Sequence, residues 1–326
     1  MPELSHHAVS SRLKQTFAIS RGSKTSAETI RVTLSENGVT GRGECVPYGR
    51  YGETVASVSN QIERARPMLE SGIDRQALQT IMPPGAARCA IDCAFWDLEA
   101  KRSNLPVWQL AGLPAPKTLP CTMSLSLDTP EKMAVAATQT PAIWLKLKLG
   151  DKRQDIDRII AVHEARPDAR LIVDGNEGIA RSDYGMLIDT AARNGVAFIE
   201  QPFGSDQDAP LLERRSSVPI CADESVHTSA DIADLSQKYQ AVNIKLDKAG
   251  GLTEAINMLR QAQQYNLGVM IGCMVAGSLS MAPALLLGAA ADVIDLDGPL
   301  WLADDIEHGL TYRDGQVRPA TAQLWG

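Results

Sequence analysis

The stretch Trp144-Leu-Lys-Leu-Lys-Leu149 is the part of the sequence from which the fold can be argued. It predicts a β-strand, because apolar and charged residues alternate and successive side chains of a strand point to opposite faces. Lys146 and Lys148 would then share one face, and the three leucines would share the other. A half-exposed edge strand with its lysines in water explains this stretch equally well. The residues that follow must decide between a buried and an exposed strand.

Short apolar runs recur from Leu119 onward, and most gaps between them carry an amphipathic helical pattern, such as Asp155 to Arg166. Alternating strands and helices predict a parallel sheet, and eight such units predict a closed barrel. Because the chain after the eighth run lacks the pattern of a barrel helix, we expect a (β/α)7β TIM-like barrel. The eight expected strands are residues 119–125, 142–149, 170–174, 196–200, 218–223, 241–246, 268–273 and 292–297.

The residues before the barrel predict a second unit that contains both strands and helices. Asn37-Gly38 separates two runs rich in β-formers, Ala27 to Ser35 and Val39 to Cys45, which is a strong signal for a hairpin. Helical patterns follow near residues 54–66, 74–81 and 85–102. Strands followed by helices are typical of an α+β domain. We therefore predict an α+β capping domain at 1–115, the barrel at 116–298, and a C-terminal segment at 299–326 that returns to the capping domain.

Two polar loops that contain glycine interrupt the predicted capping domain. They are Ser20-Arg-Gly-Ser-Lys-Thr25 and Pro47-Tyr-Gly-Arg-Tyr-Gly-Glu53. Two surface turns would explain them, and so would a pair of lid loops over a site elsewhere in the chain.

The composition is that of an ordinary globular protein, with 44% hydrophobic and 22% charged residues among 326. A net charge of −7 argues against a nucleic-acid binder that works through a general basic surface. The six cysteines form no C-x-x-C pair, the N-terminus lacks the apolar region of a signal peptide, and no apolar run approaches a membrane span. We expect a cytoplasmic protein with reduced thiols and with no nucleic-acid or membrane partner.

Acidic residues end three consecutive predicted strands of the barrel, at the end where active sites of such barrels lie. They are Asp174, Glu200 and Asp223. Each one alone is explained as well by an N-cap of the following helix. Together, three carboxylates at one edge of the barrel mouth would repel one another unless a cation lay between them. Oxygen ligands suit a hard divalent ion, so the sequence predicts a Mg²⁺ site.

Two lysines flank the three acids. Lys148 ends the second predicted strand and Lys245 ends the sixth, so they should face each other across the barrel mouth. Two bases on opposite sides of a bound metal indicate proton transfer to and from the two faces of one carbon. A lysine must be neutral to act as a base, so its pKa must be lowered. Lys146 is a nearby like charge that would lower it.

The full set of motifs resembles the enolase superfamily, specifically its muconate-lactonising subgroup and, within that, the dipeptide epimerases of the L-Ala-D/L-Glu type. The resemblance covers nearly the whole chain. It implies a Mg²⁺-dependent 1,1-proton transfer at the α-carbon of the C-terminal residue of a dipeptide. Lys148 and Lys245 would be the bases, and Lys146 would also contact the substrate carboxylate. The motifs are Lys146-Leu-Lys148, Asp174-Gly-Asn176, Glu200-Gln-Pro202, Asp223-Glu224 and Lys245-Leu-Asp247-Lys248.

The resemblance also implies residues that would bind the substrate. Asp297 is favoured over Asp295 for holding the α-ammonium, and Ser124 would lie near the substrate. Arg21 and Lys24 would reach an acidic side chain from the lid. A solvated strand end explains the two aspartates without any substrate, and a solvated basic turn explains the arginine and the lysine.

Alternative reactions on the same scaffold stay open. Lys24 stands where close relatives often carry arginine, and Ala276 where they often carry a polar or acidic residue, so the preferred dipeptide is not determined. Two lysine bases also fit a muconate cycloisomerase, an o-succinylbenzoate synthase or an N-acylamino acid racemase. Asp297 favours a dipeptide, because those other substrates lack a free ammonium. A non-catalytic binding barrel is a different class, against which the intact lysines and acids argue. The sequence also leaves open whether the chain forms a homo-oligomer.

Overall fold

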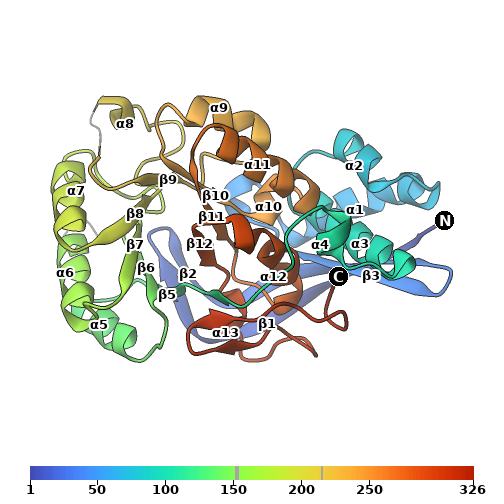
Figure 1. Ribbon diagram of the computed structural model, residues 1–326, viewed down its shortest axis with the longest axis horizontal. Helices are drawn as coiled ribbons and strands as arrows, with labels where there is room; N and C mark the ends of the chain where they lie inside the picture. Colours follow the sequence, from blue (N-terminus) through green and yellow to red (C-terminus); the bar gives the residue numbers. More distant parts are fainter. Residues whose placement is uncertain (151–153, 214–215) are drawn as a thin grey trace.

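An eight-stranded parallel sheet forms the centre of the computed structural model, which describes residues 1–150, 154–213 and 216–326 (Figure 1). The strands run in the order β12-β11-β10-β9-β8-β7-β6-β5, so strands next to each other in sequence also pair. A hydrogen bond of 2.7 Å from the Thr122 N–H to the Ile294 carbonyl oxygen brings the two ends of the sheet together. The predicted (β/α)7β barrel is therefore confirmed, in a nearly closed form. Its strands are β5 (Met123–Leu125), β6 (Trp144–Lys148), β7 (Arg170–Asp174), β8 (Val196–Glu200), β9 (Ile220–Ala222), β10 (Ala241–Ile244), β11 (Gly268–Gly272) and β12 (Val293–Asp295).

Strand β6 is buried on both faces. Its leucines at 145 and 147 are fully buried, and Lys146 and Lys148 are only 1% and 7% exposed. Lys146 reaches acids of β8 and β12, so the lysine face points into the barrel. The exposed-edge alternative is wrong, because β6 lies between β5 and β7 and pairs with both.

Helices cover the outside of the barrel (Figure 1). N-capping residues and prolines in the sequence mark where some of these helices begin. In α5, the Thr129 side chain accepts a hydrogen bond from the Lys132 N–H, and Pro130 occupies the first turn, where its missing N–H costs nothing. The helical segments are α5 (Pro130–Thr138), α6 (Asp155–Ala165), α7 (Tyr184–Arg193), α8 (Pro210–Glu213), η2 (Ser229–Asp231), α9 (Ile232–Leu235), α10 (Leu246–Ala249), α11 (Leu252–Gln264), α12 (Ser278–Leu285) and η3 (Leu286–Ala290).

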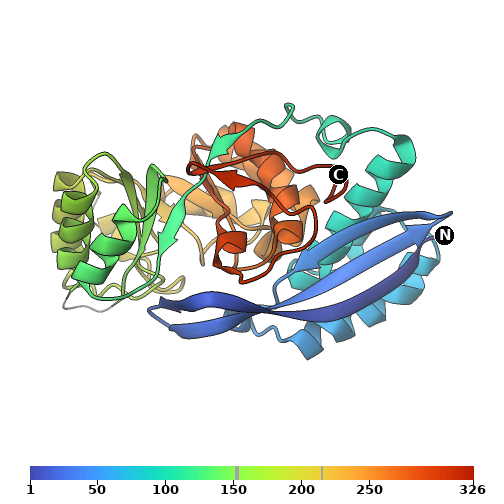
Figure 2. The same cartoon turned by 90° about the horizontal axis from the view of Figure 1, so that it is seen from below.

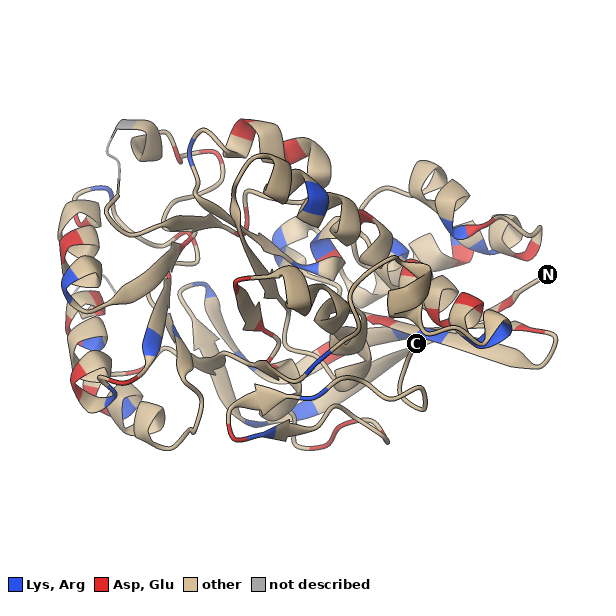
Figure 3. Cartoon of the chain, in the orientation of Figure 1, with Lys and Arg blue, Asp and Glu red and all other residues tan. Residues whose placement is uncertain are grey.

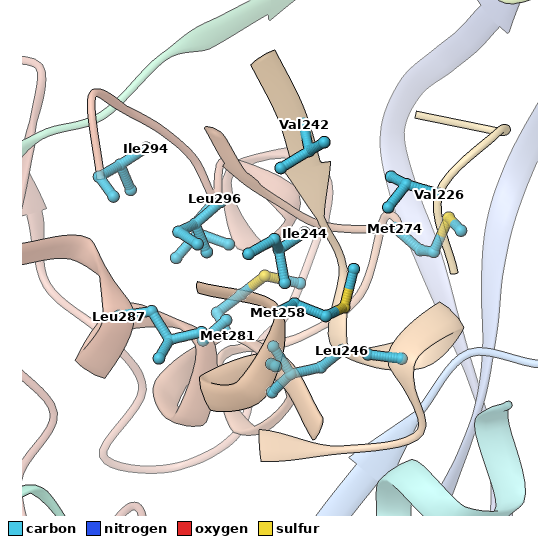
Figure 4. Packing of buried hydrophobic residues seen from close by; sticks show 14 of the residues in the cluster. Val226, Val242, Ile244, Leu246, Met258, Met274, Met281, Leu287, Ile294 and Leu296 are labelled. Carbon is cyan, nitrogen blue, oxygen red and sulfur yellow. The ribbon is translucent and has the colours of Figure 1, made fainter. Parts of the chain in front are cut away.

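The interior between β10, β12 and the helices α10, α11 and α12 is apolar (Figure 4). Val242 and Ile244 of β10 point toward Leu296, Met258 and Met281, which come from three other segments. All of these side chains are less than 2% exposed. This packing fixes the end of β10, directly after which Lys245 follows.

The N-terminal part is a three-stranded antiparallel sheet covered by helices. The predicted hairpin is present, with Asn37 at φ 52° and Gly38 at φ 80°, both in the left-handed region that a two-residue hairpin turn requires. Gly43 lets β3 lie close to α3, because a Cβ there would collide with the Ala90 carbonyl oxygen. The elements are β1 (Glu3–Ile19), β2 (Gly22–Glu36), β3 (Val39–Cys45), η1 (Gly49–Tyr51), α1 (Val55–Glu70), α2 (Arg75–Ile81), α3 (Ala86–Ser103) and α4 (Val107–Leu110).

Strand β1 and the tip of the β1–β2 hairpin differ from the prediction. The sequence pattern does not reveal β1, because ten of its 17 residues are polar. The predicted loop at 20–25 is present only as a shorter turn. Its turn consists of Ser20 and Arg21 alone, and Lys24 lies in β2 opposite Phe17. Figure 2 shows this long hairpin running from the N-terminal part along the barrel.

The C-terminal segment contacts both parts of the molecule. It contains α13 (Gly298–Trp301), β13 (Tyr312–Arg313) and β14 (Gln316–Val317), and β14 pairs with β4 (Leu119–Pro120). The predicted strand 119–125 is therefore wrong as a single strand, because β4 joins this small sheet and β5 joins the barrel. The Trp325 indole N–H donates to the Cys93 carbonyl oxygen of α3 at 3.1 Å. The predicted domain limits at 115/116 and 298/299 stay predictions.

Three further observations concern the chain as a whole. All six cysteines are free. In the described part of the chain, no helix is both long and apolar enough to cross a membrane. Acidic and basic residues occur together on outer helices such as α6 and α7 (Figure 3), so this face carries mixed charge.

Candidate active site

A cavity of about 460 Å³ lies at the carboxyl ends of the barrel strands, under the tip of the β1–β2 hairpin and η1. It brings together most of the residues that the sequence singles out. Asp174 and Glu200 do not line it, because both are fully buried beneath it. The predicted residues that line the cavity are Arg21, Lys24, Ser124, Lys146, Lys148, Asp223, Lys245, Asp295 and Asp297.

Lys146 lies among three carboxylates. Its Nζ is 2.7 Å from Glu200 Oε2, 2.8 Å from Asp295 Oδ2 and 3.2 Å from Asp174 Oδ2. Strand register explains the grouping, because Lys148 pairs with Asp174 and Asp174 pairs with Glu200 along neighbouring parallel strands. A buried ammonium without such partners would cost several kcal/mol, roughly. The carboxylates therefore make the buried lysine face of β6 possible.

The two predicted bases are each paired with a predicted metal ligand. Lys148 Nζ lies 2.6 Å from Asp174 Oδ2, and Lys245 Nζ lies 2.6 Å from Asp223 Oδ2. Lys248 holds the other oxygen of Asp223, with Nζ 2.5 Å from Oδ1. The sequence pattern assigned no role to Lys248, although its place three residues after Lys245 on the turn into α10 is the signal that could have identified it.

The predicted lowering of the lysine pKa values is wrong for Lys245 in this arrangement. Desolvation by burial lowers the pKa of Lys245, but the nearby carboxylates, first among them Asp223, outweigh it and the pKa is raised. In the same way, Asp295 and Glu200 raise the pKa of Lys146 against its desolvation. Desolvation raises the pKa of Asp223, yet Lys245 and Lys248 bring it well below its usual range. At Lys245 the like charge of Lys146 does lower the pKa, but the carboxylate of Asp223, 2.6 Å away, has the larger effect.

Two buried side chains hold the acids in place and were not predicted. The Asn243 amide donates to Glu200 Oε1 at 2.9 Å, and the Gln201 side-chain oxygen accepts from the Asp223 N–H at 2.9 Å. Both amides are fully buried. A polar residue inside an apolar strand is the signal that could have identified Asn243, which lies on β10 two residues before Lys245.

The donor set fits a hard divalent cation in its chemistry. Three fully or almost fully buried carboxylates end neighbouring strands, and Glu200 Oε2 makes no hydrogen bond although it lies close to Lys146. Among the described residues, however, no group of three or more His, Cys, Asp or Glu is arranged to hold a metal. Each predicted ligand is paired with an ammonium group instead, Asp174 with Lys148, Glu200 with Lys146 and Asp223 with Lys245. A cation would have to displace these lysines from the acids.

Asp297 also lines the cavity, and two hydrogen bonds hold its carboxylate in place. Its Oδ2 accepts hydrogen bonds from the Ser124 N–H at 2.7 Å and from the Trp301 indole N–H at 3.1 Å. Burial and the charge of Asp295 raise the pKa of Asp297. Asp295 differs, because it forms an ion pair with Lys146. Asp297 is therefore better placed than Asp295 to take a cationic group of a ligand.

The two capping loops reach the barrel through arginines. Arg21 donates to the Asn176 carbonyl oxygen at 2.7 Å and to Glu224 Oε1 at 2.8 Å, and Arg50 pairs with Glu177 at 2.8 Å. Asn176 and Glu177 both have positive φ, 42° and 66°, an unfavourable backbone that recurs at functional sites. The guanidinium of Arg21 thus binds the barrel rim, whereas its predicted contact with a substrate side chain stays a prediction.

Lys24 points into the cavity instead. Among the described residues no carboxylate forms an ion pair with it, and burial lowers its pKa to about 8. A partly buried ammonium that lacks an anionic partner among the described residues is a favourable site for a ligand carboxylate.

Comparison with known proteins places this geometry in a family. Residues 3–112 match the family described as "Mandelate racemase / muconate lactonizing enzyme, N-terminal domain", and residues 131–323 match "Enolase C-terminal domain-like". An L-Ala-D/L-Glu epimerase of Escherichia coli is 43% identical over 304 residues, which are 92% of this chain and 94% of the relative.

Two solved structures are similar over almost their whole length. One, an enolase family member from Agrobacterium tumefaciens with homology to dipeptide epimerases, holds sodium and L-Ala-L-Glu. It is 42% identical with a TM-score of 0.97, and the match covers 100% of both chains. The other, a dipeptide epimerase from Enterococcus faecalis complexed with Mg and L-Leu-L-Tyr, is 27% identical with a TM-score of 0.92. That match covers 99% of this chain and 98% of the other.

Proposed function

The chain belongs to the mandelate racemase and muconate lactonizing enzyme family of the enolase superfamily, and from this premise we propose that it is a metal-dependent dipeptide epimerase. It would invert the α-carbon of the C-terminal residue of a dipeptide such as L-Ala-L-Glu by 1,1-proton transfer. The observation that carries the proposal is one cavity lined by lysines on β6 and after β10 and by Asp297, with buried acids beneath the lysines.

Asp174, Glu200 and Asp223 would hold a divalent metal ion, and Mg²⁺ fits this requirement. When bound, the metal acts as a Lewis acid for the substrate carboxylate and so stabilises the negative charge that develops as the α-proton leaves. The similar Enterococcus faecalis epimerase complexed with Mg supports this ion.

Lys148 and Lys245 would move the proton. In this structure each Nζ is held by a carboxylate, so each lysine must leave its acid before it can reach the substrate. A divalent cation held by Asp174 and Asp223 would neutralise these carboxylates and so weaken their ion pairs with Lys148 and Lys245. One lysine then takes the α-proton from one face, and the other returns a proton to the opposite face.

The remaining cavity residues would orient the dipeptide. Asp297 offers its free oxygen to the α-ammonium, since its other oxygen already accepts two hydrogen bonds. Lys24 faces the cavity without an ion-pair partner among the described residues, and it suits the side-chain carboxylate of a C-terminal glutamate. These contacts favour a free dipeptide with an acidic second residue over a muconate or an N-acylated amino acid.

The test of the proposed function is exchange of the substrate α-proton with D₂O. Mass spectrometry of a small dipeptide library that includes L-Ala-L-Glu should show deuterium at the C-terminal residue and formation of its epimer. EDTA should abolish both, and added Mg²⁺ should restore them. If no dipeptide exchanged in the presence of Mg²⁺, a non-catalytic binding barrel would be the better description.

Replacing Asp297 with glycine should specifically reduce activity on free dipeptides. We expect kcat/KM for L-Ala-L-Glu to fall roughly ten- to hundredfold, because a hydrogen-bonded charge pair with the ammonium is lost. Activity on N-acetyl-L-Ala-L-Glu should stay equal or rise, since a buried carboxylate without a cationic partner penalises that substrate in the native enzyme. An unchanged kcat/KM for the free dipeptide would show that the ammonium binds elsewhere.

A further inference from the structure

A second cavity of about 420 Å³ adjoins the active-site cavity. Ser124 lines both cavities, so the two meet at this residue. Residues of β1, β5 and α5 line the second cavity, together with Trp301 of α13. In Figure 1, β5 and α13 lie on the same side of the barrel, and α13 contacts β1.

We use the term end wall for four residues that each line one or both cavities and contact one another: Phe17, Ser124, Asp297 and Trp301. All four residues are buried, with 3–9% of their surface exposed. Asp297 and Phe17 face the active-site cavity, and Trp301 faces the second one. The rings of Phe17 and Trp301 meet edge to face, with centroids 4.6 Å apart at 77°.

Hydrogen bonds to Asp297 join the wall into one unit. Its Oδ2 accepts from the Ser124 N–H at 2.7 Å and from the Trp301 indole N–H at 3.1 Å, and these donors come from strand β5 and helix α13. The two donors fix the carboxylate so that one oxygen serves the wall and the other is left for the cavity. Trp301 thus both orients Asp297 and fills the space behind it.

This arrangement has a consequence for the length of the substrate. An α-ammonium at Asp297 marks the N-terminal end of a peptide, and any further residue or acyl group would have to continue through the end wall. Such a substrate would also replace the ammonium with a neutral amide and leave the buried carboxylate unpaired, which is unfavourable. The space that an extension would need exists on the far side, in the second cavity.

We propose that Trp301 is a specificity-determining residue that ends the substrate site at the N-terminal residue of a dipeptide. By fixing Asp297 and closing the way to the second cavity, it makes the enzyme reject tripeptides and N-acylated dipeptides. Opening the wall would let the extension enter the second cavity. This inference rests on the proposed dipeptide epimerase function.

Trp301→Phe tests the hydrogen bond while keeping an aromatic ring in the wall. We expect KM for L-Ala-L-Glu to rise roughly tenfold with little change in kcat, because a hydrogen bond to a charged group is lost and Asp297 is less well fixed. KM for N-acetyl-L-Ala-L-Glu should not rise. Trp325→Phe is the matched control, since its indole also donates at 3.1 Å, to a carbonyl oxygen distant from the cavity. A general loss of stability would affect both variants and both substrates.

Trp301→Ala and Trp301→Leu test the barrier itself, and thermal unfolding identifies which of them is folded. In D₂O, exchange at the C-terminal residue of L-Ala-L-Ala-L-Glu should rise at least tenfold relative to exchange in L-Ala-L-Glu. The inference is wrong if this ratio is unchanged in a folded variant, or if wild-type enzyme already accepts the tripeptide as well as the dipeptide. If neither variant folds, the KM change in Trp301→Phe decides. A wild-type protein that exchanges no dipeptide contradicts the proposed function instead, which separates the two failures.

Discussion

Replacing either Lys148 or Lys245 with alanine should abolish epimerisation while leaving one-sided exchange of the α-proton with D₂O. The two lysines lie on β6 and directly after β10, four strands apart in the eight-strand order, and both line the cavity. They would therefore approach the α-carbon from opposite faces. Inversion needs both, so each substitution should lower the rate of epimerisation by roughly 10²–10⁴-fold, the usual contribution of a positioned acid or base.

Isotope exchange distinguishes this two-base mechanism from a one-base mechanism. In D₂O, wild-type enzyme should place deuterium in the inverted product from the first turnover, because the proton is returned by the other lysine. One alanine variant should exchange only the L-epimer and the other only the D-epimer, each through its surviving lysine. Which variant does which depends on how the substrate lies in the cavity. NMR or mass spectrometry of each pure epimer measures this directly.

Lys238→Ala is the matched control for the two lysine variants. Lys238 also forms a single close ion pair, 2.7 Å from Asp208, but it does not line the cavity. Its replacement should leave both epimerisation and exchange at wild-type level. Near-normal epimerisation in Lys148→Ala or Lys245→Ala would remove that lysine from the mechanism.

Asp174→Asn, Glu200→Gln and Asp223→Asn should each lose divalent metal binding and turnover. A direct ligand should cost more than the roughly 10–100-fold in metal affinity that loss of an outer partner costs. Titration calorimetry with Mg²⁺ measures the affinity without reference to activity. Thermal unfolding gives a second measure, because a metal that binds only the folded state raises Tm in wild-type protein and should raise it less in each variant.

The amide variants should stay folded. Each amide keeps the shape of the acid and an oxygen that still accepts a hydrogen bond from the neighbouring lysine. Glu44→Gln is the control, since Glu44 is a buried acid paired with Arg31 at 2.7 Å outside the cavity. It should bind Mg²⁺ as wild type does. A cavity variant with full activity and an unchanged metal affinity would exclude that acid from the metal site.

The ion pairs between lysines and acids give these predictions a common physical basis. Asp174 and Asp223 are buried, and a buried carboxylate needs a positive partner. Lys148 and Lys245 provide these partners in this structure. Lys248 differs from Lys245, because it holds Asp223 Oδ1 and lies outside the cavity lining. Lys248 can therefore keep its contact when Lys245 leaves.

Local sequence patterns determined the barrel and the place of its site. Alternation within 144–149 and a repeated strand–helix pattern depend only on side-chain direction and on which residues can be buried together. Parallel strands end at one edge, so an acid or lysine at the end of each strand predicts a common site before any contact is known. This is why Lys148, Asp174, Glu200, Asp223 and Lys245 could be singled out from their positions alone.

Only the tertiary structure decided how those residues are paired and what closes the cavity. Lys146 donates a hydrogen bond to Asp295, which is 149 residues away in the sequence. The Trp301 indole and the Ser124 N–H of the first barrel strand both donate to Asp297. The turn at Arg21 contacts Asn176 and Glu224 although no local signal links them. Such contacts depend on where the chain returns in space, and a hydrogen bond between distant segments leaves no periodic pattern in either one. The sequence by itself therefore determined the fold and the chemical groups of the site. The register of the barrel strands decided their charge partners, and the packing of the N-terminal hairpin and the C-terminal segment decided the extent of the cavity.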